Sequence, residues 1–188
     1  MAKNDDDWLF GTGAVATERA LVWATTAVAV GLLVCVAHVD DVAWSVWQWL
    51  LCVALTVDVV GGVPANALGS AKRFYHSPAP PGSPRLQRVL RSHVGFAALH
   101  LHPFVLAALL PDGTVTWSVT WYLVSLLGTC AVVAAPLYLR RPLAAAVVAL
   151  AMIAASLVAP PPGLAWFGPL LVIKLVAMHA VPEEPYRP

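Results

Sequence analysis

Apolar residues occur in six long stretches along the chain, and short polar connectors separate most of them. The stretches cover residues 20–39, 43–68, 93–110, 115–139, 143–159 and 164–181. A helix needs about 17 to 25 predominantly apolar residues to cross a bilayer, and all six stretches fall in or near this range. The pattern therefore predicts an all-α, polytopic membrane protein: one bundle of six transmembrane helices that forms a single domain over residues 1–188.

The composition agrees with this prediction. Of the 188 residues, 60% are hydrophobic and 11% are charged, whereas soluble domains carry about 25% charged residues. The net charge of +1 and the lack of a basic tail argue against nucleic acid as a partner. The N-terminus is acidic and has neither the basic region nor the cleavage site of a signal peptide, so we expect it to be retained. The excess of Ala and Val suggests a GC-rich bacterial genome.

The basic residues predict the orientation of the bundle. Ten of the eleven lysines and arginines lie at one set of span ends, and the loops at the opposite ends carry none. Cytoplasmic loops carry the excess of Lys and Arg, so both termini are expected in the cytoplasm and the protein in the bacterial inner membrane. The ten residues are Lys3, Arg19, Lys72, Arg73, Arg85, Arg88, Arg91, Arg140, Arg141 and Arg187.

Two further features fit this orientation. The loop 69–92 is rich in proline and basic residues, and its second half is expected to form a short helix at the cytoplasmic interface. Six tryptophans lie at the opposite span ends and predict an aromatic belt at the outer interface. They are Trp44, Trp47, Trp49, Trp117, Trp121 and Trp166.

Ionisable residues gather at one depth, in the cytoplasmic half of spans two, three and six. At 1.5 Å per residue, Asp58 lies roughly 15 Å deep, His100 and Lys174 roughly 10 Å, and His102 roughly 13 Å. Ionisable groups are costly in a bilayer, so these side chains are expected to point into the bundle and to have a function. Others lie near the cytoplasmic span ends or just outside them: His76, His93, His179, Glu183 and Glu184.

Span two combines a polar face with a weakened helix. Asp58, Gly62 and Asn66 are spaced i, i+4, i+8 and so lie close to one face. Gly61, Gly62 and Pro64 weaken the helix beside them, and irregular backbone at membrane depth is tolerated only where it is buried in protein or lines a cavity. The sequence leaves two interpretations open here, a cavity wall or close helix packing through small residues.

In span three, the segment "HLHP" predicts a break in the helix. Pro103 biases His102 away from helical geometry, and a break would let both His100 and His102 turn inward. In a regular helix these two side chains would point about 160° apart. In span six, Lys174 and His179 are five residues apart, about 140° around an α-helix, so they are not expected to face the same point.

Imidazole and carboxylate groups in a water-poor site favour a transition metal, so we expect one or two ions, with iron favoured and zinc, copper or manganese also suitable. The spacing matches no diagnostic metal motif. Lys174 and Asn66 are the candidate catalytic residues, and Lys174 would hold a substrate anion or pair with Asp58. The candidate metal ligands are Asp58, His76, His93, His100, His102, His179 and Glu183.

The leading hypothesis is a small membrane metalloenzyme, an oxidase or hydroxylase that acts on an amphipathic or anionic small molecule, with the loop 69–92 over its entry. One alternative is a proton-coupled transporter or exporter subunit, functioning as a homodimer, in which Asp58 and the histidines relay protons. Another is a membrane partner or assembly protein without catalysis, whose polar groups only join helices.

Overall fold

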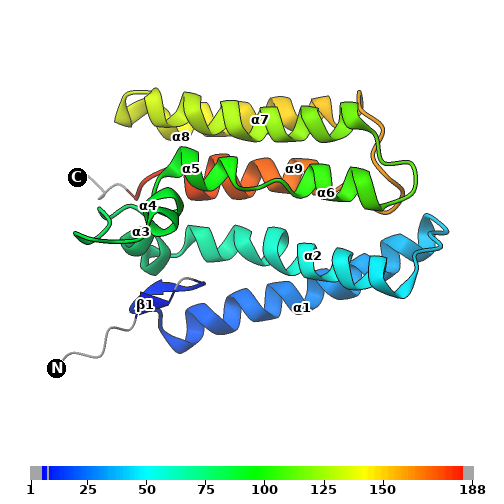
Figure 1. Cartoon of the computed structure of the whole chain (residues 1–188), viewed down its shortest axis with the longest axis horizontal. Coiled ribbons are helices and arrows are strands. Elements are labelled where there is room, and N and C mark those ends of the chain that lie inside the picture. Colours follow the sequence, from blue (N-terminus) through cyan, green and yellow to red (C-terminus); the bar gives the residue numbers. More distant parts are fainter. Residues whose placement is uncertain (1–5, 8, 184–188) are drawn as a thin grey trace.

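The computed structural model describes residues 6–7 and 9–183. Lys3, Glu184 and Arg187 lie outside the described residues. Within them the protein is helical, apart from a two-residue pairing of β1 (Asp6–Asp7) with β2 (Gly11–Thr12). Figure 1 shows the helices running roughly parallel to one long axis, in three tiers, with the described residues nearest the two chain ends at the same end of the bundle.

Four helices are long and apolar enough to cross a membrane: α1 (Ala16–Val39), α2 (Val46–Ala67), α7 (Val115–Ala134) and α8 (Leu137–Ala154). They indicate a multi-pass membrane protein. Many of their large apolar side chains are exposed, including Leu32 and Leu150, which is the arrangement expected of helices that face lipid.

The third and sixth apolar stretches form shorter, interrupted helices in the middle tier of the bundle (Figure 1). The third consists of α5 (His93–Ala98) and α6 (His102–Leu109), which are separated by three non-helical residues at the expected position. The sixth consists of α9 (Phe167–Val172), which continues into a π-helical turn, η1 (Ile173–His179). Both interruptions lie beside the polar residues of α2.

The loop 69–92 is more helical than the sequence indicated. The expected interfacial helix is α4 (Arg85–Leu90), and α3 (Gly69–Tyr75) follows α2 almost without a break. The β-hairpin rests on α3, and a side chain at Gly11, whose φ is +79°, would overlap the backbone of Ser70. Together these segments cover one end of the bundle (Figure 1).

The expected connector at Arg140 and Arg141 is wrong, because both residues lie within α8. The chain turns earlier, at Ala135–Pro136, since proline cannot donate the hydrogen bond that would continue α7. Arg140 then reaches back across the turn and donates to the carbonyls of Ala135 (3.0 Å) and Val133 (2.9 Å). The arginine thus satisfies carbonyls at the end of α7 that lack helical partners.

The prediction of an aromatic belt is only partly correct. Trp44, Trp117 and Trp121 are buried in the core, whereas Trp47 is half exposed. Gly168 makes room for Trp121, because a side chain at this position would overlap the indole ring. Trp117 and Trp121 thus pack against α9, and Trp44 packs beside Gly163 and Trp49, so these rings lie inside the protein.

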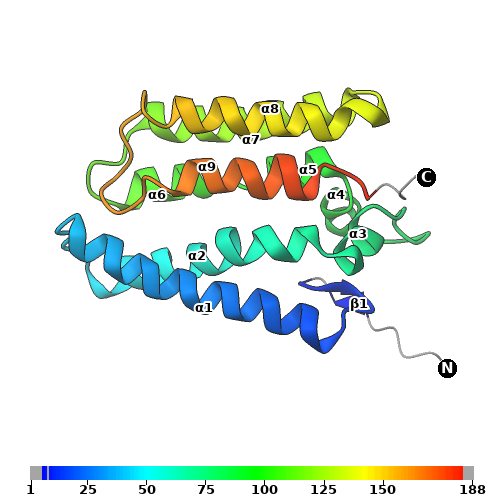
Figure 2. The same cartoon turned by 180° about the vertical axis from the view of Figure 1, so that it is seen from behind.

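The helix α1 stands apart from the rest of the bundle. It packs mainly against α2, and its buried residues, Val22, Thr26, Leu33 and Ala37, lie on one side. Figure 2, from behind, shows α1 and α2 in the tier farthest from α7 and α8. A cavity lined by residues of α1, α2 and the α5–α6 segment lies on this side, over the polar face of α2.

Candidate functional site

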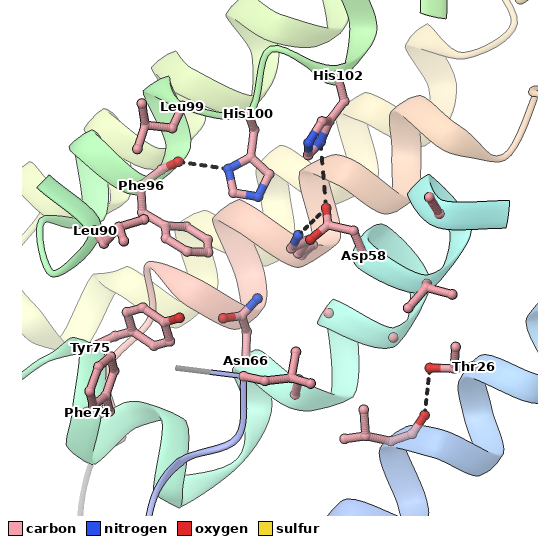
Figure 3. A pocket seen from close by; sticks show the side chains of 18 of the residues that line it. Thr26, Asp58, Asn66, Phe74, Tyr75, Leu90, Phe96, Leu99, His100 and His102 are labelled. Carbon is pink, nitrogen blue, oxygen red and sulfur yellow. Dashed lines mark hydrogen bonds and ion pairs between the residues drawn. The ribbon is translucent and has the colours of Figure 1, made fainter. Parts of the chain in front are cut away.

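Asp58, His100 and His102 come together between α2 and the α5–α6 break. One ligand atom from each of them lies within 4.8 Å of the others, which is the geometry of a group that could hold a metal ion. His102 Nδ1 lies 3.6 Å from Asp58 Oδ2 and has no hydrogen-bond partner among the described residues. Figure 3 shows the two imidazoles and the carboxylate converging from α2 and the α5–α6 break.

The break between α5 and α6 is what aims both histidines inward. Pro103 lies in the first turn of α6, where its missing N–H costs no helical hydrogen bond. His100 is 7% exposed, and its Nδ1 lies 2.7 Å from the carbonyl oxygen of Phe96. A carbonyl only accepts, so Nδ1 carries the proton and Nε2 of the neutral ring has a free lone pair. Histidines that bind metals are held in this way.

Lys174 supplies a positive charge next to this group. Its Nζ lies 2.7 Å from Asp58 Oδ2, and its side chain is 3% exposed, against 45% for Asp58. The ion pair that depth alone suggested is therefore present. One carboxylate has about four lone-pair sites, so the bond to Lys174 leaves Asp58 able to accept further ligands.

Lys174 and His179 do not face one point, as expected, but both contact α2, which the α-helical angle of about 140° does not indicate. Both lie in η1, where hydrogen bonds join residues five apart, as from Ala180 N to Leu175 O (3.0 Å). Residues five apart then lie over one another, so Lys174 reaches Asp58 and His179 reaches Asn66 on the same face of α2. Such turns are rare and are frequently found at functional sites.

Two glycines in α2 allow these approaches. A side chain at Gly62 would lie 2.6 Å from Lys174 Cε, so its absence lets the lysine stem cross α2 to reach Asp58. A side chain at Gly61 would overlap the hydroxyl of Thr26 on α1. Both interpretations of this segment, close packing and a cavity wall, are therefore correct.

A second group of three histidines lies nearer the α3–α4 end. The ring centroids of His76 and His93 are 4.2 Å apart, and those of His93 and His179 are 5.5 Å apart. His179 Nδ1 lies 3.4 Å from Asn66 Oδ1, and its buried Nε2 has no hydrogen-bond partner in the described part of the chain. This second histidine group does not reach the 4.8 Å ligand spacing of the first.

Phe96 separates the two groups. Its ring stacks on His179, with centroids 4.0 Å apart, and its centroid lies 4.7 Å from that of His100. The seven expected metal ligands therefore do not form one site. The sequence does not predict that Phe96 separates two histidine groups, since a phenylalanine in an apolar span usually only packs against its neighbours.

The remaining candidate, Glu183, lies away from both groups. Its carboxylate lies beside Gly69 and close to Lys72. Lys72, which the sequence gave no reason to single out, donates to the carbonyls of Met178 and Val181 (2.5 Å) at the end of η1. Burial lowers the pKa of Lys72 to about 8, although the charge of Glu183 raises it. Glu183 thus lies beside Lys72 and outside both histidine groups.

His76 lies at the outer edge of the second group, and its Nε2 donates to the carbonyl of His179 (2.9 Å). Burial, together with the nearby charges of His93 and Lys72, lowers the pKa of His76 to about 4. The ring is therefore neutral at physiological pH, with the lone pair of Nδ1 free to accept a proton or a ligand.

A cavity of about 590 Å³ opens over the Asp58–His100–His102 group. Its volume falls within the range of about 300–1,000 Å³ that small-molecule sites occupy. Most of its lining is apolar, and its polar groups include Asp58, His100, His102 and Lys174 (Figure 3). A largely apolar cavity with a few convergent polar groups is the usual form of a ligand site.

Comparison with known proteins identifies no relative. No protein-family model, no curated protein and no solved structure matches the chain. The argument for function therefore rests on the geometry of the site.

Proposed function

We propose that this protein is a small integral-membrane metalloenzyme in which Asp58, His100 and His102 bind a divalent transition metal. The observation that carries the proposal is the convergence of these three side chains to within 4.8 Å. The proton on His100 Nδ1 and the unpartnered Nδ1 of His102 support it, because both rings have nitrogens free to bind.

The donor set favours an oxidase or hydroxylase. Two histidines and one carboxylate form the ligand set of non-haem iron enzymes, and they leave coordination positions open for oxygen and substrate. Iron is therefore the metal we propose first, and zinc, copper and manganese also accept these donors. Lys174 would hold Asp58 in position, while Asn66, which also lines the cavity, would orient His179.

Placement in the membrane is part of the proposal. We infer that α5–α6 and α9–η1 cross the bilayer with the four long helices, which makes six crossings. The described basic residues of α3 and α4, Lys72, Arg73, Arg85 and Arg88, lie at one end of the bundle. The positive-inside rule then puts this end in the cytoplasm, and in a bacterium the protein in the inner membrane.

One observation favours a second function, proton-coupled transport. His76, His93 and His179 form a row of rings from the α3–α4 end into the bundle, and only Phe96 separates them from His100. Such a row could carry protons to Asp58. In that function the histidines would exchange protons and hold no metal.

Elemental analysis of the detergent-purified protein separates these functions. We expect near-stoichiometric metal in the wild type and its loss from the His100→Ala/His102→Ala variant. His38→Ala is the matched control, because His38 is exposed at the opposite end of the bundle, and it should retain the metal. A metal-free wild type, purified without chelators, would contradict the metalloenzyme and favour proton relay.

A further inference from the structure

The cavity is elongated along α2. On this helix its lining extends from Ala54 to Asn66, which is roughly 18 Å at 1.5 Å per residue. Thr26 on α1 borders one side and Leu99, at the end of α5, borders the other, while Lys174 contributes to the floor. Figure 3 shows this arrangement, with Thr26 and Leu99 on opposite sides of Asp58 and Asn66.

The sides of the cavity are apolar and its mouth is exposed. Trp23 on α1 is 51% exposed and Leu99 is 45% exposed, and both line the cavity. Among the described helices α1 packs mainly against α2, and both Trp23 and Leu99 stay exposed at the edges of the cavity. In a membrane this opening would face the lipid chains, so a hydrophobic molecule could enter without crossing water.

One end of the cavity is basic. Arg91, just after α4, lines it together with Gln87. The Arg91 guanidinium lies over the Phe74 ring, 4.2 Å from its centroid, and one Nη donates to the carbonyl of Pro78 (3.3 Å). Its Nε is buried and has no hydrogen-bond partner in the described part of the chain. A buried donor of this kind needs an acceptor, and an anionic group fits a guanidinium best.

We propose that the cavity binds a single-chain amphiphile with an anionic headgroup, either a carboxylate or a phosphate. The headgroup lies at Arg91 and Gln87, and the hydrocarbon chain follows α2 past Gly62 to Ala54. Asn66 and Asp58 are eight residues apart on α2, which is roughly 12 Å along the helix. The metal group therefore contacts the hydrocarbon chain of the ligand and does not contact its headgroup. The binding site stands on the cavity alone, and only the reaction on the chain rests on the proposed function.

Binding to the purified full-length protein tests this proposal, with oleate, oleyl phosphate and oleyl alcohol as probes in native mass spectrometry. We expect the two anions to bind and the alcohol to bind at least about tenfold more weakly, because it lacks the charge that Arg91 requires. The ratio of oleate to oleyl phosphate affinity identifies the preferred headgroup. Equal binding of the alcohol, or displacement of oleate by inorganic phosphate alone, would overturn the proposal.

Two variants locate the ligand in the cavity. Arg91→Gln should remove the preference for anions, and Arg85→Gln is its control, because Arg85 begins the helix that Arg91 follows but does not line the cavity. Ala54→Trp should weaken oleate but not decanoate, whose shorter chain ends before this position. Equal effects of the two arginine variants, or equal weakening of both fatty acids, would contradict this placement.

Oleate binding and metal content, both measured on the wild type, separate this proposal from the metal site. The headgroup contact is at Arg91 and the metal group is Asp58, His100 and His102, so each measurement can succeed without the other. If the wild type binds oleate but contains no metal, the ligand site stands and the metalloenzyme fails. If it contains metal but does not bind oleate, the metal site stands and the proposed ligand site fails.

Discussion

At the scale of single residues, the balance of charge around Asp58 decides what the site can hold. Lys174 is almost completely buried, whereas nearly half of the Asp58 side chain is exposed to the cavity. The carboxylate can therefore exchange one cationic partner for another, but the lysine depends on Asp58. This asymmetry is consistent with a carboxylate that serves a metal and a lysine that keeps it in place.

The asymmetry predicts unequal effects of removing each partner. Asp58→Asn leaves a buried ammonium without its counter-charge and should lower the free energy of unfolding by about 3–5 kcal/mol. Lys174→Met should cost less, because the remaining carboxylate is partly solvated. The thermal unfolding midpoint in detergent measures both effects.

The double variant Asp58→Asn/Lys174→Met tests the pairing itself. It should be more stable than Asp58→Asn alone, since the buried charge is gone. Strictly additive losses would mean that the two side chains do not interact.

Residue chemistry in the sequence predicted part of this site. Pro103 indicated the break that turns His100 and His102 inward, and depth indicated the meeting of Asp58 with Lys174. The division of the histidines into two groups was not predictable, because it depends on where the Phe96 ring lies in three dimensions. Glu183 was assigned by its proximity along the chain, whereas Lys72 and Gly69, its actual neighbours, are more than 100 positions away.

At the scale of elements, irregular helices determine which side chains meet. The α-helical angle places Lys174 and His179 on different sides of their helix, whereas in the π-turn η1 both side chains contact α2, at Asp58 and Asn66. A π-turn has no sequence signature comparable to proline, since it arises from packing along the whole helix. The break after α5 was predictable because proline acts locally on the residue before it.

The crossing of Lys174 over α2 predicts a large effect at Gly62. Gly62→Ala should lower the thermal midpoint and weaken metal retention, because the new methyl group displaces the lysine stem from Asp58. Gly31→Ala is the matched control, since nothing lies within 4 Å of a side chain there. It should be neutral or slightly stabilising, as is usual for Gly→Ala within a helix. Equal effects of the two changes would show that helix propensity, not the close approach, explains the result.

At the scale of the whole molecule, hydrophobicity predicted the helical membrane bundle and most of its connections. The boundaries were less accurate. The sequence predicted the turn before α8 at Arg140 and Arg141, because charged residues usually mark a connector. In the structure Arg140 lies inside α8 and donates hydrogen bonds to carbonyls at the end of α7. The positions of Trp117 and Trp121 were also predicted wrongly, because both rings are buried against α9 and not at a membrane interface.

Six crossings with the basic end in the cytoplasm predict a specific pattern of chemical accessibility. Ser77→Cys lies in the loop between α3 and α4, and Pro111→Cys lies between α6 and α7 at the opposite end, and both positions are exposed. In a background without the three native cysteines, a membrane-impermeant maleimide added to intact cells should label Pro111→Cys and not Ser77→Cys. Lysis should expose Ser77→Cys to the reagent, because its loop then faces the solution. Labelling of both positions in intact cells would mean that α5–α6 does not cross the membrane, and the reverse pattern would place the basic loop and the mouth of the headgroup site outside the cell.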